Sequence, residues 1–240
     1  MDLSTSLGLS ARVMAGSWSP FVSPSLGLVA SAHFDFVANQ HFWNGARRTT
    51  AEFTAFTGAT FGTGDDAGLI GPGTATDHNI SIAWADLNIA APFVMVSVFR
   101  PKLLDGTTQM VISIEAASSI STNRTQFATD ASNKIVHKTI TGAVSQAFQE
   151  SGPMTVDTNY AIATLVQTGL FRNAVNGATA GPEDLAGTLP TYSLLRLLEA
   201  AGNVFPFTGR LRHVLFFAQT GGSEISQANL NTLSGELALI

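Results

Sequence analysis

The chain has no cysteine among its 240 residues, and few of its side chains are charged. The absence of cysteine excludes a disulfide framework, a zinc site built on thiolates and a thiol nucleophile. Charged residues make up 12% of the chain, about half the share of an average globular domain. Much of the surface must therefore consist of Ser, Thr, Asn, Gln and Ala, as is expected where a surface meets other subunits.

Positive charge is also sparse, with 12 Lys and Arg against 17 Asp and Glu and a formal net charge of −5. The basic residues are scattered, so the sequence predicts no nucleic-acid partner and no anionic membrane surface. The N-terminus lacks the basic start and continuous apolar core of a signal peptide, and the longest apolar runs, such as "APFVMVSVF", are too short to cross a bilayer. We therefore expect no membrane insertion.

Apolar residues are frequent, at 45% of the chain, together with 22 Gly and 9 Pro. They recur with a period of two, as at Met110, Ile112 and Ile114, whereas the continuous run 93–99 is typical of a strand buried on both faces. No long amphipathic helix lies between these segments, which favours antiparallel pairing over βαβ units. The sequence predicts one all-β domain, an antiparallel β-sandwich.

Two Asn-Gly pairs, at 44–45 and 176–177, predict tight hairpin turns, because both turn positions require a positive φ. The C-terminal third predicts a strand over 192–198, a corner where Phe205 and Phe207 pack near Gly209, and a last core strand over 211–217. Ser223 or Ser226 is expected to cap a short closing helix.

The N-terminal segment is apolar without a helical period. Residues 1–27 are interpreted as an arm or attachment segment, followed by the sandwich domain at 28–240. Trp18, Phe21 and Val22 are the candidate assembly residues of this arm. A segment of this kind either docks on another subunit or adds a strand to its own domain, and the sequence leaves both alternatives open.

The succession "FRNAVNG", "YSLLRLLEAAG", "FTG", "RLRHVLFFAQ" and "ISQANLNTL" resembles the C-terminal half of laminin-G-like, concanavalin A-like jelly-roll domains. One departure is "LRLLEAAG", which stands where these domains have Leu-x-Leu-Gly. "FDFVANQHFWNGARRTTAEFTAF" followed by "DDAGLI" resembles a segment near the start of structural proteins of tailed bacteriophages and prophage-like particles. The resemblances imply a jelly-roll sandwich in a phage or phage-like particle.

An enzyme on this fold would most plausibly be a glycoside hydrolase, which requires two carboxylates on one surface. The glucanases of this architecture place both on one strand, and no strand here has that arrangement. Glu115 stands alone, whereas Glu183 and Asp184 lie in a Pro/Gly loop. There is no Gly-x-Ser-x-Gly elbow either, so we expect no enzymatic activity.

Three residues are candidates for ligand binding. Asp65 and Asp66 lie in the Gly-rich stretch "GTGDDAG", where loop carboxylates and backbone carbonyls are able to hold Ca²⁺; a solvated turn with Asx hydrogen bonds is the simpler alternative. Trp43, beside a hairpin turn, would either stack on a sugar ring or pack with its indole N–H on a backbone partner.

The histidines do not predict a metal site. His33 and His41 are eight residues apart in a hairpin and would be able to meet across it. The others, His78, His137 and His213, are scattered, and His213 is interpreted as an ordinary strand residue with a satisfied ring.

The leading hypothesis is a non-enzymatic virion structural protein: a head fibre, a decoration protein or a tail-associated subunit, made in the bacterial cytoplasm and displayed on the particle. It implies contacts with other virion proteins, a homo-oligomer, and loops that are candidates for binding host surface glycan, with no cofactor beyond the candidate Ca²⁺. The alternative is a free carbohydrate-binding module or a sandwich-fold glycoside hydrolase. A third reading is an oligomerisation surface without any ligand.

Overall fold

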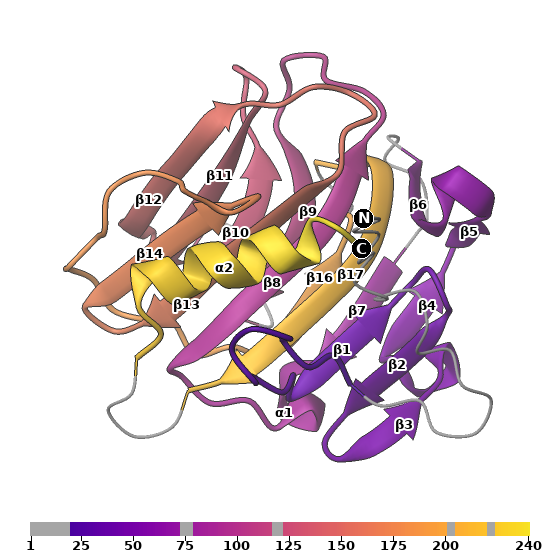
Figure 1. Cartoon of the computed structure of the whole chain (residues 1–240), viewed down its shortest axis with the longest axis horizontal. Coiled ribbons are helices and arrows are strands. Elements are labelled where there is room, and N and C mark those ends of the chain that lie inside the picture. Colours follow the sequence, from indigo (N-terminus) through magenta and orange to yellow (C-terminus); the bar gives the residue numbers. More distant parts are fainter. Residues whose placement is uncertain (1–19, 73–78, 117–121, 201–204, 220–223) are drawn as a thin grey trace, which may run out of the picture.

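The computed structural model describes residues 20–72, 79–116, 122–200, 205–219 and 224–240. Over these ranges the strands form two antiparallel sheets, with a single long helix, α2 (Gln227–Leu237), lying across the outer face of one of them (Figure 1). Neither α-helix of the described residues is long and apolar enough to cross a membrane. The architecture is an all-β jelly-roll sandwich with a short C-terminal helix, as the sequence predicts.

The first sheet has ten strands, and its centre is formed by its two longest. In spatial order it contains β15 (Ala178–Thr179), β14 (Leu170–Val175), β13 (Tyr160–Gln167), β8 (Phe93–Pro101), β17 (Thr208–Ala218), β1 (Ala32–Asp35), β2 (Gln40–Trp43) and β3 (Ala46–Arg48). On the side of β17 that faces away from β8, two strands pair with it. Its second half pairs with β1, and its first half pairs with β6 (Gly68–Pro72), which in turn pairs with β5 (Thr60–Gly62).

The second sheet has seven strands. In spatial order it contains β12 (Val144–Pro153), β11 (Lys134–Thr141), β10 (Arg124–Thr129), β9 (Gln109–Glu115), β16 (Leu194–Leu197), β7 (Asn79–Ala83) and β4 (Ala55–Thr57). The remaining elements are α1 (Trp84–Leu87) and two 3₁₀ turns, Thr50–Glu52 and Gly64–Asp66. The late strand β16 lies between β7 and β9, so segments distant in sequence become neighbours at the centre of this sheet.

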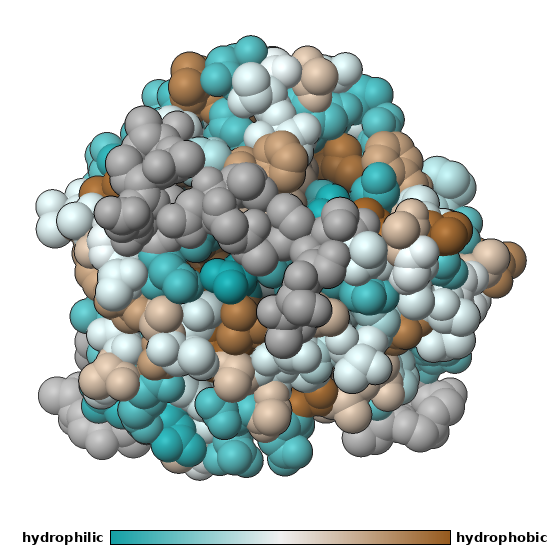
Figure 2. Space-filling view, turned by 180° about the vertical axis from the view of Figure 1, so that it is seen from behind, coloured by the Kyte–Doolittle hydropathy of each residue, from teal (hydrophilic) through white to brown (hydrophobic). Residues whose placement is uncertain are grey.

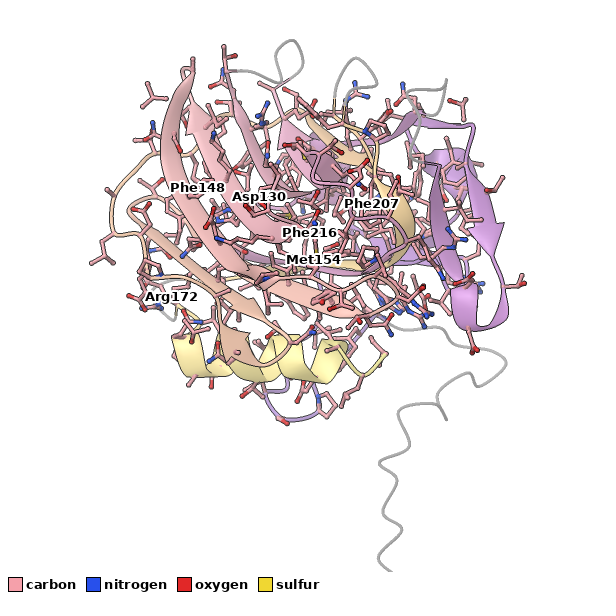
Figure 3. The ribbon with its side chains drawn as sticks, turned by 90° about the horizontal axis from the view of Figure 1, so that it is seen from above. Asp130, Phe148, Met154, Arg172, Phe207 and Phe216 are labelled. Carbon is pink, nitrogen blue, oxygen red and sulfur yellow. The ribbon has the colours of Figure 1, made fainter. Side chains whose placement is uncertain are left out.

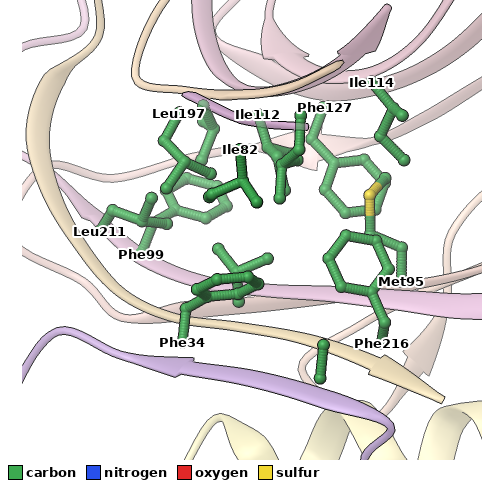
Figure 4. Close-up of a cluster of buried hydrophobic side chains, with 14 of the residues drawn as sticks. Phe34, Ile82, Met95, Phe99, Ile112, Ile114, Phe127, Leu197, Leu211 and Phe216 are labelled. Carbon is green, nitrogen blue, oxygen red and sulfur yellow. The ribbon is translucent and has the colours of Figure 1, made fainter. Parts of the chain in front are cut away.

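The main core lies between the two sheets. Figure 4 shows side chains from both layers meeting there, among them Phe34 and Phe216 from the ten-stranded sheet and Ile112, Phe127 and Leu197 from the other. Each of these five is fully buried, and burial of one such side chain contributes roughly 1.5–3 kcal/mol. The inward apolar residues of β9 and the aromatic residues of β1 therefore form opposite sides of one core.

A second apolar layer lies between the ten-stranded sheet and α2. Leu230, Leu233 and Leu237 of the helix, which lies on β13 and β14, are fully buried in one cluster with outward residues of the sheet, including Val94 and Val96 of β8. This second layer explains why the run 93–99 is apolar on both faces. Figure 3 shows the arrangement from above, with α2 on the side of the ten-stranded sheet that faces away from the seven-stranded sheet.

The turns and caps follow the sequence closely. Asn44 and Gly45 have φ of 49° and 73°, and Asn176 and Gly177 have φ of 47° and 86°, so both predicted hairpin turns are confirmed. Ser226 caps α2, and its hydroxyl accepts a hydrogen bond from the Asn229 amide at 3.2 Å. Ser223, the other predicted cap, lies outside the described residues.

Two local expectations were wrong. The strand expected over 192–198 is shorter, Leu194–Leu197, because the backbone turns at Leu198, whose φ is 67°. Phe207 packs at the predicted corner, where a Cβ at Gly209 would lie 2.5 Å from the Phe207 ring. Phe205 does not pack with it and is 41% exposed.

Candidate functional site on the outward face of the seven-stranded sheet

Trp43 is in the core and not on a binding surface. Its side chain is 2% exposed; Phe34 stacks on it with ring centroids 5.4 Å apart, and the Arg48 guanidinium carbon lies 5.7 Å from its ring centroid. It touches one surface hollow, together with Asn44, Arg48, Glu52 and Asp86, but Arg48 is paired there with Glu52 at 2.8 Å. The predicted stacking of a sugar on Trp43 is therefore wrong, since the ring is enclosed by side chains of its own domain.

Asp66 belongs to an ion-pair network. Its carboxylate contacts Lys102 at 2.5 Å, Arg210 at 3.8 Å and Arg100 at 3.9 Å. A hydrogen bond from Lys102 is the main reason that the pKa of this carboxyl is lowered. Neighbouring Asp65 is exposed and contributes its backbone carbonyl to Arg100 at 3.0 Å. Lys102 and Arg100 also pair with Asp157, at 2.6 and 3.5 Å. Three cations around these two carboxylates do not fit a Ca²⁺ site, because they compete with the ion for the same oxygens.

The described end of the predicted arm lies against its own sandwich. Phe21 packs on Phe217 with centroids 6.3 Å apart, whereas Val22 is 41% exposed and forms a bridge with Val29. The Ser23 hydroxyl donates to the Glu236 carboxylate of α2 at 2.6 Å. Trp18 and the rest of residues 1–19 lie outside the described residues, so attachment through the arm stays a prediction.

Sequence reasoning missed a row of polar side chains on the outward face of the seven-stranded sheet. The residues are direct neighbours across five strands, in the order Ser81 (β7), Arg196 (β16), Ser113 (β9), Gln126 (β10) and Lys138 (β11). Their sequence neighbours, such as Ile112, Phe127 and Leu195, are in the core, so alternation directs the row outward. Figure 2 views the molecule from the side opposite α2, where hydrophilic and apolar residues are interspersed.

Beside this row lies a cluster of four charged side chains. Arg196 Nε is 3.2 Å from Glu115 Oε2, and Arg196 Nη1 is 3.9 Å from Glu199 Oε1. Arg124 is the direct strand partner of Glu115. Glu115 and Glu199 are 1% and 0% exposed, whereas Arg124 and Arg196 are only partly buried. The cations are therefore the members of the cluster that a ligand is able to reach.

Burial changes the protonation of this cluster. Desolvation raises the pKa of Glu199 to about 7, an effect that Arg196 opposes and Glu115 reinforces. Burial also lowers the pKa of Arg124, which Glu115 partly offsets. The row and the cluster together contain three cationic side chains, Arg124, Lys138 and Arg196, and two carboxyl groups, Glu115 and Glu199.

Two buried polar atoms of the row, Ser113 Oγ and Gln126 Oε1, have no hydrogen-bond partner within the described part of the chain. Buried polar atoms in native proteins are almost always paired, with protein, water or ligand. Ser113 and Gln126 are only 0% and 5% exposed, so the groups of this face that a negatively charged ligand is able to reach are the partly exposed cations Arg124, Lys138 and Arg196. The sequence signal for this face was the alternation of Val111, Ser113 and Glu115 along one strand.

No protein-family model matches the chain, and no curated protein matches its sequence. Among solved structures, the chain is similar to the CBM40 of the Ruminococcus gnavus IT-sialidase bound to α2,3-sialyllactose, with a TM-score of 0.51, 9% identity, and coverage of 63% of this chain and 86% of that one. It is also similar to the Trypanosoma rangeli sialidase in complex with the inhibitor DANA, with a TM-score of 0.57, 15% identity, and coverage of 91% of this chain and 35% of that one.

These likenesses show the fold, and they confirm the jelly-roll sandwich predicted from the sequence. They come from a carbohydrate-binding module and a sialidase, and they do not test the predicted place in a virion. That location, its virion partners and the homo-oligomer therefore stay predictions from the sequence resemblance.

Proposed function

We propose that this protein is a non-catalytic, glycan-binding β-sandwich that takes its ligand on the outward face of the seven-stranded sheet. The observation that carries the proposal is the group of partly exposed cations on this face, Arg124, Lys138 and Arg196. The other members of the polar row, Ser81, Ser113 and Gln126, are buried, at 2%, 0% and 5% exposed. Guanidinium and ammonium groups held on a sheet donate hydrogen bonds that suit the hydroxyl and carboxylate oxygens of a sugar. The similarity of the fold to a sialyllactose-bound CBM40 supports it.

The charges of this face favour an acidic glycan. The three cations Arg124, Lys138 and Arg196 outnumber the two carboxyl groups of Glu115 and Glu199, and burial raises the pKa of Glu199 to about 7. A guanidinium or ammonium group binds a sugar carboxylate through charge-assisted hydrogen bonds, each worth about 1.5–3 kcal/mol. A neutral sugar would gain none of this energy, so the face should distinguish glycans by charge.

Hydrolysis is the second candidate function, because Glu115 and Glu199 lie on one face and the pKa of Glu199 is raised to about 7, as for a general acid. The geometry favours binding alone. The Arg196 guanidinium contacts both carboxylates, at 3.2 and 3.9 Å, so a substrate would have to compete with this ion pair. Glu199 is also 0% exposed and has no surface for a substrate.

The test is calorimetric titration of the full chain with 3′-sialyllactose and, separately, with lactose, which differ by the acidic sugar. We expect measurable binding of sialyllactose and at least about 10-fold weaker binding of lactose. Lys138→Gln should weaken sialyllactose binding by about 10-fold, while Arg47→Gln, an exposed cation on β3 of the other sheet, should leave it unchanged.

Equal binding of the two sugars, or equal effects of the two substitutions, would overturn the proposal. The same solutions, analysed by chromatography after incubation, distinguish the second function. Release of free sialic acid would show that the protein is an enzyme, whereas intact sialyllactose is expected of a binding protein.

A further inference from the structure

Three side chains of types that bind metal ions converge on the ten-stranded sheet, on the side of α2 and away from the proposed glycan face. His33 and Asp35 are two residues apart on β1 and so point to the same face. Asp35 is the direct partner of His213 on β17, and His33 pairs with the next outward position, Leu215. Phe34 and Phe36, which alternate with them, are in the core.

The distances in this group fit the corners of a small coordination sphere. His33 Nε2 lies 3.4 Å from His213 Nδ1, and His213 Nδ1 lies 3.6 Å from Asp35 Oδ1. All three atoms lie within 4.8 Å of one another. Around Zn²⁺, with bonds of about 2.0–2.2 Å to nitrogen and oxygen, tetrahedral ligand atoms are about 3.3–3.6 Å apart. The His33–His213 and His213–Asp35 distances match this spacing.

The local structure positions these ligands. Asp35 Oδ1 accepts hydrogen bonds from the amides of Val37 and Ala38, at 3.0 and 2.8 Å, which fixes its carboxylate at the start of the turn. His33 and His213 are each 6% exposed, and their burial restricts the rings to one arrangement. The Asp35 side chain is 15% exposed, which leaves a route from solvent.

The protonation states suit metal binding. Burial, reinforced by His213, lowers the pKa of His33 to about 3, and burial together with the charge of Arg212 lowers that of His213 to about 3. Both rings are therefore neutral at physiological pH, the form in which imidazole is a ligand. The Asp35 carboxylate offsets the positive charge of the nearby Arg212.

We propose that His33, Asp35 and His213 form a binding site for a divalent transition-metal ion of the zinc type, with a fourth position open to water. Two histidines and one carboxylate are a ligand set that Zn²⁺ accepts. The arrangement without an ion is a hydrogen-bonded pair, in which His33 Nε2–H donates to His213 Nδ1. The ion takes the place of that proton between the two rings.

Binding of a metal ion at this site would change a hydrogen bond of the N-terminal segment. The Phe21 amide donates to His33 Nδ1 at 3.3 Å, which places the ring proton on Nε2. When Nε2 binds the ion, that proton moves to Nδ1, where it faces the Phe21 N–H, and this hydrogen bond is lost. Occupancy of the site is therefore coupled to a looser attachment of residues 21–30 to the sheet.

The test uses the full chain, titrated with zinc chloride by calorimetry and with cobalt(II) by visible absorption. We expect one ion per chain, with the intense visible bands of four-coordinate cobalt. Asp35→Asn keeps the oxygen that accepts from Val37 and Ala38 but removes the charge, so the fold is preserved and Zn²⁺ binding should weaken at least about 10-fold. Asp86→Asn, an exposed carboxylate on α1, is the matched control and should bind as the wild type does.

Hydrogen exchange of the Phe21 amide supplies a second readout and should become faster when zinc is added to the wild type but not to Asp35→Asn. Stoichiometric zinc binding that survives both Asp35→Asn and His213→Gln would place the ion elsewhere and overturn the proposal. Failure of the wild type to bind zinc or cobalt would show that the two histidines form only a hydrogen-bonded pair.

Discussion

The two outward faces of the sandwich differ in what covers them. On the ten-stranded sheet, Val94 and Val96 are buried in one apolar cluster with Leu230, Leu233 and Leu237 of α2, so this face is a second core. The seven-stranded sheet instead presents a polar row with partly exposed Arg196 and Lys138. One face therefore contributes to stability and the other is suited to ligand binding. The outward positions of the strands are apolar on the first face and polar on the second.

Acidification should have the largest effect, and it should act through the helix-side face and the core. Burial holds the pKa of His33 and His213 at about 3 and that of His41 and His137 at about 4, below the ordinary value of 6.5. Below pH 6.5 the unfolded chain takes up protons that the folded chain excludes, so stability falls as pH drops toward 4.

Between pH 7 and pH 5 each histidine should remove on the order of 1–2 kcal/mol, or several kcal/mol in total. Urea denaturation at a series of pH values measures this loss. A free energy of unfolding that is constant from pH 7 to pH 5 would mean that these rings are hydrated.

The next largest effect distinguishes the two faces directly. Leu233→Ala should cost about 2–5 kcal/mol, because it leaves a cavity between α2 and the sheet. Phe148→Ala, on β12 of the seven-stranded sheet, removes a larger side chain that is 49% exposed and should cost less than about 1 kcal/mol. Midpoints of urea unfolding compare the two variants, and similar losses would contradict the assignment of the faces.

Glu199 allows the polar face to be tested by pH. Its pKa is raised to about 7 from 4.5, chiefly by burial, so above pH 4.5 the unfolded chain loses a proton that the folded chain retains, and stability falls as pH rises to about 7. Glu199→Gln removes this penalty and should gain about 1–3 kcal/mol relative to wild type between pH 5 and pH 8. A difference between the two proteins that does not change with pH would show that Glu199 is ionised throughout.

The smallest effect concerns the segment that precedes β1. Ser23→Ala removes the hydroxyl that donates to Glu236 at 2.6 Å, and should lower the free energy of unfolding by about 0.5–1.5 kcal/mol. Ser25→Ala is the control, because Ser25 contacts Glu236 through its backbone amide. Equal losses in both variants would argue against the hydroxyl contact.

The sequence predicted what depends on local pattern. The continuous run of β8 indicated burial on both faces, and the two Asn-Gly pairs placed their turns correctly. It did not predict what depends on pairing between distant strands. The charged cluster around Glu115 was missed because Arg196 reaches Glu115 only when β16 pairs beside β9, and the two residues are 81 positions apart in the chain.

The same limitation explains the histidines and Trp43. His33 was compared with His41 across the hairpin, but the register pairs His41 with Phe34 on the core side, so the two rings are on opposite faces. His213 meets His33 because β17, the last strand, pairs with the first. The sequence left open whether Trp43 stacks on a sugar or packs in the domain, because a position beside a turn does not fix the face of the ring; the ring packs on Phe34 and Phe53.

The most direct test of the central claim is to follow the backbone amide resonances of the full chain by NMR during titration with 3′-sialyllactose. The account predicts that the shifts that change belong to β9, β10, β11 and β16 and surround Arg124, Lys138 and Arg196, and that the amides of α2 do not respond. Changes confined to α2 and the ten-stranded sheet, or no change at millimolar sugar, would contradict the assignment of glycan binding to the seven-stranded sheet.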